Sequence, residues 1–119
     1  MAWELDSKQS IYGQLVDIIL RRIVTGVYPP GSRLDSVRDL ATEAGVNPNT
    51  MQRAFAELER TGIIVTQRTS GRFVTDDEEM VKTIREELAI KAVENMKSEL
   101  RELGYEDGEI IELVSKEDK

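Results

Sequence analysis

Neither cysteine nor histidine occurs among the 119 residues of this chain. The absence of cysteine excludes disulfides and thiolate metal sites, and it fits a cytoplasmic protein. The absence of histidine removes the usual proton shuttle and the commonest metal ligand, which weakens most hydrolase and metalloenzyme hypotheses. A glycine-rich loop that could cradle a phosphate is also missing. We therefore expect no enzyme, no metal site and no cofactor.

Long hydrophobic segments are missing as well. No apolar run approaches the ~20 residues that cross a bilayer, and the first residues, MAWELD, lack the basic and then apolar layout of a signal peptide. Hydrophobic residues make up 39% and charged residues 33% of the chain, which is typical of a folded, helix-rich protein. The length suits one ordinary domain, or a small domain with an appendage, and no membrane partner is expected.

The charged residues are unevenly distributed along the chain. The net charge of -7 would by itself argue against a nucleic-acid partner. Residues 1–75, however, contain nine Lys or Arg and eight Asp or Glu, a net charge of +1, whereas residues 76–119 contain seven against fifteen, a net charge of -8. Because the acidic part need not face the same partner as the first part, net charge does not exclude DNA binding.

Hydrophobic periodicity predicts three helices in the first part of the chain, over about 10–26, 36–45 and 47–62. Ser36 is expected to cap the second of these helices, and Pro48 lies in the first turn of the third, where its missing N–H does no harm. The period then changes to that of a β-hairpin.

The hairpin is expected to have strands at 63–66 and 72–75 and a tip at 67–71. A long helix opens at the acidic residues 76–79, and a last short helix surrounds 110–114. The four acids could bind a cation, but carboxylates more commonly stabilise the positive end of a helix.

Two short helices joined by a tight turn, preceded by a helix and followed by a hairpin, indicate a winged helix-turn-helix. We therefore predict a mostly α fold with a small β-hairpin wing, in which residues 1–76 form the winged helix-turn-helix domain and residues 77–119 form a two-helix tail. The second helix of such a motif enters the major groove with its N-terminal residues leading. Its first turn offers side chains that can hydrogen-bond and mostly point away from the buried stripe: Asn47, Asn49, Thr50, Gln52 and Arg53. A polar helix face is by default merely solvated, so this face alone leaves DNA binding open.

Three long segments of the sequence, at 28–41, 45–59 and 62–74, closely resemble the DNA-binding domain of the GntR family of transcription regulators. The resemblance covers roughly the first 75 residues. The segment Val-Asn-Pro-Asn-Thr and the short acidic tail are similar to the YtrA-type branch in particular. Members of that branch lack a large effector-binding domain and dimerise through short C-terminal helices.

The resemblance also implies the positions of DNA contacts. Arg38, on the first helix of the motif, would reach a base edge or a phosphate, although pairing with Glu43 is an alternative. The hairpin tip would lie near the minor groove or the backbone. With Arg53 added because it neighbours these positions, the expected DNA-binding residues are Arg38, Asn47, Asn49, Thr50, Gln52, Arg53, Arg68, Thr69, Ser70 and Arg72.

Two residues depart from the usual family pattern. Asp35 stands where the family usually has proline, which would loosen the start of the first motif helix and place a negative charge near the DNA. Thr69 occupies a wing position that is usually glycine, where a positive φ is favoured. We expect the fold to tolerate both, with the details of the wing contact affected.

The tail carries apolar residues at helical spacing, which could pack on the first domain but are expected to pair with a second copy. The residues of this expected dimer interface are Ile84, Leu88, Ala92, Met96, Leu100, Leu103, Ile110, Ile111 and Val114. A two-fold dimer would align two recognition helices on a palindromic operator with half-sites about one helical turn apart.

By the resemblance, we expect a homodimeric transcriptional repressor that binds double-stranded DNA. Such regulators often control transporter operons. One alternative is a protein–protein adaptor, but arginines on both the recognition helix and the wing speak against it. A second alternative is a metabolite-sensing regulator, which would need a pocket, for example in the dimer interface near Tyr105 and Met96, and the tail is short for one. Whether a small-molecule effector exists stays open.

Overall fold

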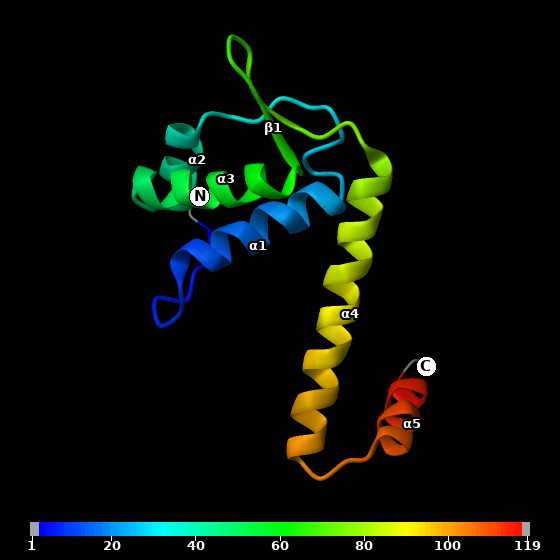
Figure 1. Cartoon of the computed structure of the whole chain (residues 1–119). Helices are drawn as coiled ribbons and strands as arrows, with labels where there is room; N and C mark the ends of the chain where they lie inside the picture. The colour runs from blue at the N-terminus through cyan, green and yellow to red at the C-terminus, as the bar shows by residue number, and fades with distance from the viewer. Residues whose placement is uncertain (1–2, 118–119) are drawn as a thin grey trace. The chain divides into compact units, whose positions relative to one another are not determined.

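The computed structural model describes residues 3–117, apart from the side chain of Glu117, and confirms a mostly helical fold with one antiparallel hairpin (Figure 1). The chain divides into two compact units between Ile84 and Arg85. The elements in order are α1 (Ile11–Val24), α2 (Val37–Ala44), α3 (Pro48–Thr61), β1 (Ile64–Gln67), β2 (Gly71–Val74), α4 (Glu78–Glu102) and α5 (Asp107–Glu117).

Each of the first three helices begins after a polar residue that caps it. The Oγ of Ser10 accepts a hydrogen bond from the backbone N–H of Gly13 at 3.2 Å, and the Oγ of Ser36 accepts one from Asp39 at 3.1 Å. These bonds satisfy donors that the first turn of a helix cannot pair internally. The expected starts of α1 and α2 are therefore confirmed. Gly45, at φ +76°, ends α2 in the left-handed conformation that makes the tight turn into α3 possible.

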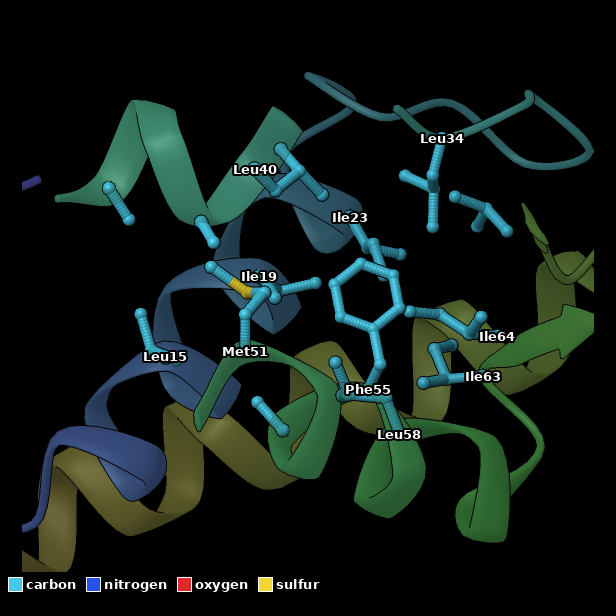
Figure 2. Packing of buried hydrophobic residues seen from close by; sticks show 14 of the residues in the cluster. Leu15, Ile19, Ile23, Leu34, Leu40, Met51, Phe55, Leu58, Ile63 and Ile64 are labelled. Carbon is cyan, nitrogen blue, oxygen red and sulfur yellow. The ribbon is translucent and has the colours of Figure 1, made fainter. Parts of the chain in front are cut away.

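The core of the first unit lies where α1 and α2 pack on α3 and the hairpin closes one end. Figure 2 shows the ring of Phe55 at the centre, among Ile23, Leu34 and Ile64. The largest buried side chains come from all these elements: Leu15, Ile19, Ile23, Leu40, Met51, Phe55, Leu58, Ile63, Ile64 and Val74. Burial of this many large apolar side chains is the main stabilisation of a small domain.

The wing consists of β1 and β2, paired in register from Ile64 opposite Val74 to Gln67 opposite Gly71. Both strands lie one residue from their predicted positions, so the tip contains only residues 68–70. The segment before α2 joins β2 through an isolated β-bridge between Arg33 and Phe73, and the backbone N–H of Leu34 donates to the carbonyl of Arg72 at 2.8 Å. The wing is thereby attached to the polypeptide that leads into α2.

The first unit extends eight residues beyond the domain end expected at residue 76. Asp77 caps α4, since its Oδ1 accepts hydrogen bonds from the backbone N–H groups of Glu79 and Met80 at 3.1 and 3.2 Å. Met80, Val81 and Ile84 then pack, partly buried, against the core. The acidic run therefore provides a helix cap, which was the favoured of the two expectations for it.

The second unit is a helical hairpin of the remainder of α4 and α5 (Figure 1). The turn is held by Asp107, whose carboxylate accepts from Arg101 at 2.8 Å and lies 3.6 Å from the Nζ of Lys97. Ile110 is buried in this unit, whereas α4 buries no residue at all. Between residues 3 and 117 no helix is long and apolar enough to cross a bilayer.

Candidate nucleic-acid interface

The N-terminal turn of α3 presents its polar side chains to solvent. Asn49 and Gln52 are exposed, and Thr50 is half-buried. Asn47 is the N-cap, and its Oδ1 accepts from the backbone N–H of Asn49 at 2.7 Å, so only its amide group remains to donate to a ligand. The positive end of the helix dipole lies here, which favours an approaching phosphate or an electron-rich base edge.

Arg38 is exposed on α2, and within residues 3–117 its guanidinium forms no ion pair. The alternative pairing of Arg38 with Glu43 is wrong, because Glu43 binds two other donors. Its Oε2 accepts from the indole Nε1 of Trp3 at 2.7 Å and from the Nη1 of Arg22 at 3.0 Å. Arg38 is therefore available to an external anion.

A cluster around Arg22 was not anticipated from the sequence. The guanidinium of Arg22 lies 4.4 Å from the centre of the Trp3 ring and donates to the hydroxyl of Tyr28 at 2.7 Å. The hydrogen bond from Trp3, and after it the one from Arg22, lowers the pKa of Glu43 from its ordinary value of 4.5. The cluster ties the segment before α1 to α2, the helix that carries Arg38.

Arg53 has a partner within the domain. Its guanidinium lies 4.2 Å from the centre of the Tyr12 ring, in the geometry of a cation–π contact. This contact holds Arg53 against α1, although the side chain is still exposed. As a DNA contact, Arg53 stays a prediction.

Arg72 also has partners within the domain, on α3. Val74 is buried, and alternation along β2 puts Arg72 on the same inner face. There its Nε lies 3.4 Å from Glu59, which also accepts a hydrogen bond from Thr66, and its guanidinium lies 5.6 Å from the Phe55 ring. The structure thus gives Arg72, expected on the DNA, a role in joining the wing to α3.

The tip of the wing is a tight, exposed loop of Arg68, Thr69 and Ser70. The backbone N–H of Ser70 donates to the carbonyl of Gln67 at 3.2 Å and closes the loop. Among the described residues only glycines have a positive φ, so Thr69 does not need one. The left-handed position of the wing is Gly71, at φ +108°.

Arg33 is an exposed cation that sequence reasoning left out of the interface. It lies before α2 and forms an isolated β-bridge with Phe73 of β2. Its guanidinium covers Gly71, since a Cβ added to that glycine would lie 3.2 Å from the Nε of Arg33. The alternation of Arg33 with the buried Leu34 could have indicated a strand, but three residues give too weak a period to predict one.

The residues expected at the dimer interface lie in three different environments. Ile84 packs against the core of the first unit, and Ile110 is buried within the second. The half-buried members are Leu88, Met96 and Leu100, and the exposed members are Ala92, Leu103, Ile111 and Val114. Two further apolar residues of α4, Ile90 and Val93, are exposed and were not expected at the interface.

Met96 and Tyr105, named for an effector pocket in the dimer interface, line separate hollows of the second unit. Met96 lines a hollow of about 390 Å³ with Val93, Ile110 and Ile111. Tyr105 lines a separate hollow on α5. A pocket that two copies of the chain would form near these residues stays a prediction.

The first unit has three helices followed in sequence by a β-hairpin, and exposed polar groups lie at the start of the third helix. These features define a winged helix-turn-helix DNA-binding domain. Here it is followed by a helical hairpin. Residues 11–74 match the family described as bacterial regulatory proteins, gntR family. The chain belongs to the GntR family, as predicted. It is a transcriptional regulator with a DNA-binding helix-turn-helix and not an enzyme.

Individual relatives extend this assignment over most of the chain. The chain is 37% identical over 109 residues to the HTH-type transcriptional regulator YhcF of Bacillus subtilis, covering 92% of this chain and 90% of that protein. It is 40% identical over 76 residues to the HTH-type transcriptional repressor YtrA of the same organism, covering 62% and 58%. A solved GntR family transcriptional regulator from Listeria monocytogenes superposes with a TM-score of 0.86 at 44% identity, covering 94% of this chain and 98% of that one.

Proposed function

We propose that the chain represses transcription in the cytoplasm by binding a palindromic operator as a homodimer. One observation supports DNA binding most strongly. Arg38 is exposed, has no ion pair among the described residues, and lies on α2, the helix next to the polar start of α3. A bidentate guanidinium and side-chain amides are the groups that read base edges in the major groove. Repression is proposed from the similarity to YtrA, which is named as a repressor.

The DNA contacts proposed for this face combine base reading with backbone contacts. On α2 and α3, we assign Arg38, Asn49, Thr50 and Gln52 to the major groove, with the amide group of Asn47 beside them. At the wing, we assign residues 68–70 to the minor groove or the backbone. Contacts to phosphates position a regulator, whereas contacts to base edges make it specific.

The second unit supports a dimer because it buries very little by itself. Ile110 is buried at 3% exposure, whereas Ile90, Val93, Ile111 and Val114 are between 51% and 68% exposed. Val93, Ile111 and Val114 line the hollow that Met96 also lines, so exposed apolar side chains of both helices adjoin one another. A contiguous exposed apolar surface of this kind is typical of an interaction site.

A second copy of the chain is the partner we propose for this surface. Homodimers with two-fold symmetry pair the same patch on both chains. The pairing would bring two winged helix-turn-helix domains to one duplex, with half-sites about one helical turn apart. By resemblance to its branch, we expect the regulated genes to encode a transporter.

Selection of bound duplexes from fragmented genomic DNA tests this proposal. The purified chain is incubated with the pool at physiological salt, and the retained fragments are sequenced. We expect enrichment of one inverted repeat, which also locates the regulated operon. Enrichment of single half-sites would contradict the dimer, and retention of no fragment above background would contradict specific DNA binding.

A further inference from the structure

Five of the nine basic side chains among residues 1–75 are already engaged within the chain. Ion pairs hold four arginines, namely Arg21, Arg22, Arg60 and Arg72. Arg53 lies on the ring of Tyr12. Of the nine Lys and Arg among residues 1–75, those without an ion pair or cation–π contact within residues 3–117 are Lys8, Arg33, Arg38 and Arg68.

Arg33 is held where the wing meets the rest of the domain. Arg33 forms a β-bridge with Phe73 of β2. Two backbone hydrogen bonds fix the chain on either side of it: the N–H of Leu34 donates to the carbonyl of Arg72 at 2.8 Å, and the N–H of Val74 donates to the carbonyl of Ser32 at 2.9 Å. Because Leu34 is buried, alternation places Arg33 on the outer face, opposite to Arg72. Arg72 is therefore neutralised on the inner face of β2, whereas Arg33 is free on the outer face of the segment that pairs with β2.

The side chain of Arg33 extends along the wing toward the tip. Its Nε and Nη2 lie 3.2 and 3.4 Å from the position that a Cβ on Gly71 would occupy. Gly71 pairs with Gln67, and these two residues flank the loop of Arg68, Thr69 and Ser70. Glycine at position 71 thus leaves room for a guanidinium directly beside the tip. Figure 1 shows that the tip points away from α1.

We infer that Arg33 binds a phosphate of the DNA backbone beside the wing tip, as a second cation next to Arg68. This inference rests on the proposed DNA-binding face. A guanidinium matches a phosphate with two parallel hydrogen bonds. Arg33 lies alongside Gly71 and does not belong to the tip loop. It would therefore contact the DNA backbone that borders the minor groove, while the tip contacts the groove itself. The carboxylate of Asp35, two residues further on, forms no ion pair with it among the described residues.

The salt dependence of DNA binding tests the inference. Affinity is measured between 50 and 200 mM salt for a duplex recovered by selection and for a shuffled duplex of equal length. Each neutralised phosphate contributes about 0.9 to the slope of log affinity against log salt. Arg33→Gln should reduce the slope by about 0.9 per bound chain and weaken both duplexes by the same factor. Arg33→Lys should keep the slope of the wild type.

Arg21→Gln is the matched control, because it removes the same charge from α1, where Arg21 pairs with Asp17 at 2.8 Å. Its slope should equal that of the wild type, and thermal unfolding verifies that each variant is folded. A wild-type slope for Arg33→Gln would overturn the inference while leaving the proposed function intact. A loss confined to the selected duplex would overturn it as well, since that result indicates base reading. Failure of the wild type to bind either duplex would refute both.

Discussion

Glu43 is the carboxylate on which three parts of the first unit meet. Trp3 comes from the segment before α1, Arg22 from α1, and Glu43 itself from α2. Charged hydrogen bonds of this kind are stronger than neutral ones, although partial exposure reduces their net contribution. Because Arg38 lies on the same short helix, the cluster also fixes the position of a proposed DNA contact.

Glu43→Gln should destabilise the domain in a pH-dependent way. The folded pKa of Glu43 lies below 4.5, so its carboxylate stabilises the fold above that pH and loses this effect as the pH falls through the lowered pKa. At pH 7 we expect a loss of about 1 kcal/mol, which lowers the melting temperature by several degrees. The difference from the wild type should disappear at acid pH. Thermal unfolding followed by circular dichroism, and by the fluorescence of Trp3, measures it.

Glu57→Gln is the control for this prediction. Glu57 also pairs with an arginine, Arg60, but the Arg60 side chain is 70% exposed and the pair spans one turn of α3. An exposed pair of this kind contributes little to stability. Equal losses for the two variants at pH 7, or a Glu43→Gln loss that persists at acid pH, would contradict the account of the cluster.

At the scale of the elements, the helices were predictable and the roles of the wing arginines were not. Capping residues and apolar spacing predicted α1, α2 and α3 because those signals are local. The strands were placed one residue off. The contacts of Arg72 with Glu59 and Phe55 were not anticipated, because the face of a short strand depends on which residue is buried. As a DNA contact, Arg72 stays a prediction. The β-bridge before α2 forms through backbone pairing with β2, which no local pattern reveals.

The α4–α5 hairpin shows the same limit. Regular spacing predicted one apolar stripe from Ile84 onward, but spacing does not say which partner covers each residue. The first turns of α4 pack on the winged domain, so Ile84 already has neighbours in its own chain. Ile90 and Val93 lie outside the predicted stripe and are exposed. The proposed dimer surface therefore includes residues that the stripe omitted.

Val93→Asp tests the role of this hairpin. A carboxylate within an apolar dimer surface would be desolvated without a partner, so we expect a monomer in light scattering and a large loss of operator affinity. Asn95→Asp adds the same charge at a nearby exposed position of α4 that does not line the hollow, and it should remain dimeric. Dimers of both variants would show that the surface lies elsewhere.

At the scale of the whole molecule, charge distinguishes the two parts of the chain. Residues 1–75 carry a net charge of +1, and residues 76–119 carry -8. Phosphates would repel the acidic tail, so in the proposed function DNA approaches the winged helix-turn-helix and the tail is left to pair with another tail. The free cations would come from α2, from Arg33 and from the wing tip, and the polar groups for base edges from α3. DNA reading and dimerisation would then be divided between the two parts of a small chain.

The central claim is that Arg38 and the N-terminal turn of α3 read base edges of DNA. Titration of a selected inverted-repeat duplex with the wild type and with Arg38→Ala tests this claim most directly. Loss of one bidentate base contact costs about 1–3 kcal/mol, a factor of roughly 5 to 150 in affinity. We predict a loss in this range for Arg38→Ala, with the dimer and the thermal transition unchanged, and two wild-type chains per duplex. Wild-type affinity in the folded Arg38→Ala variant would contradict the account.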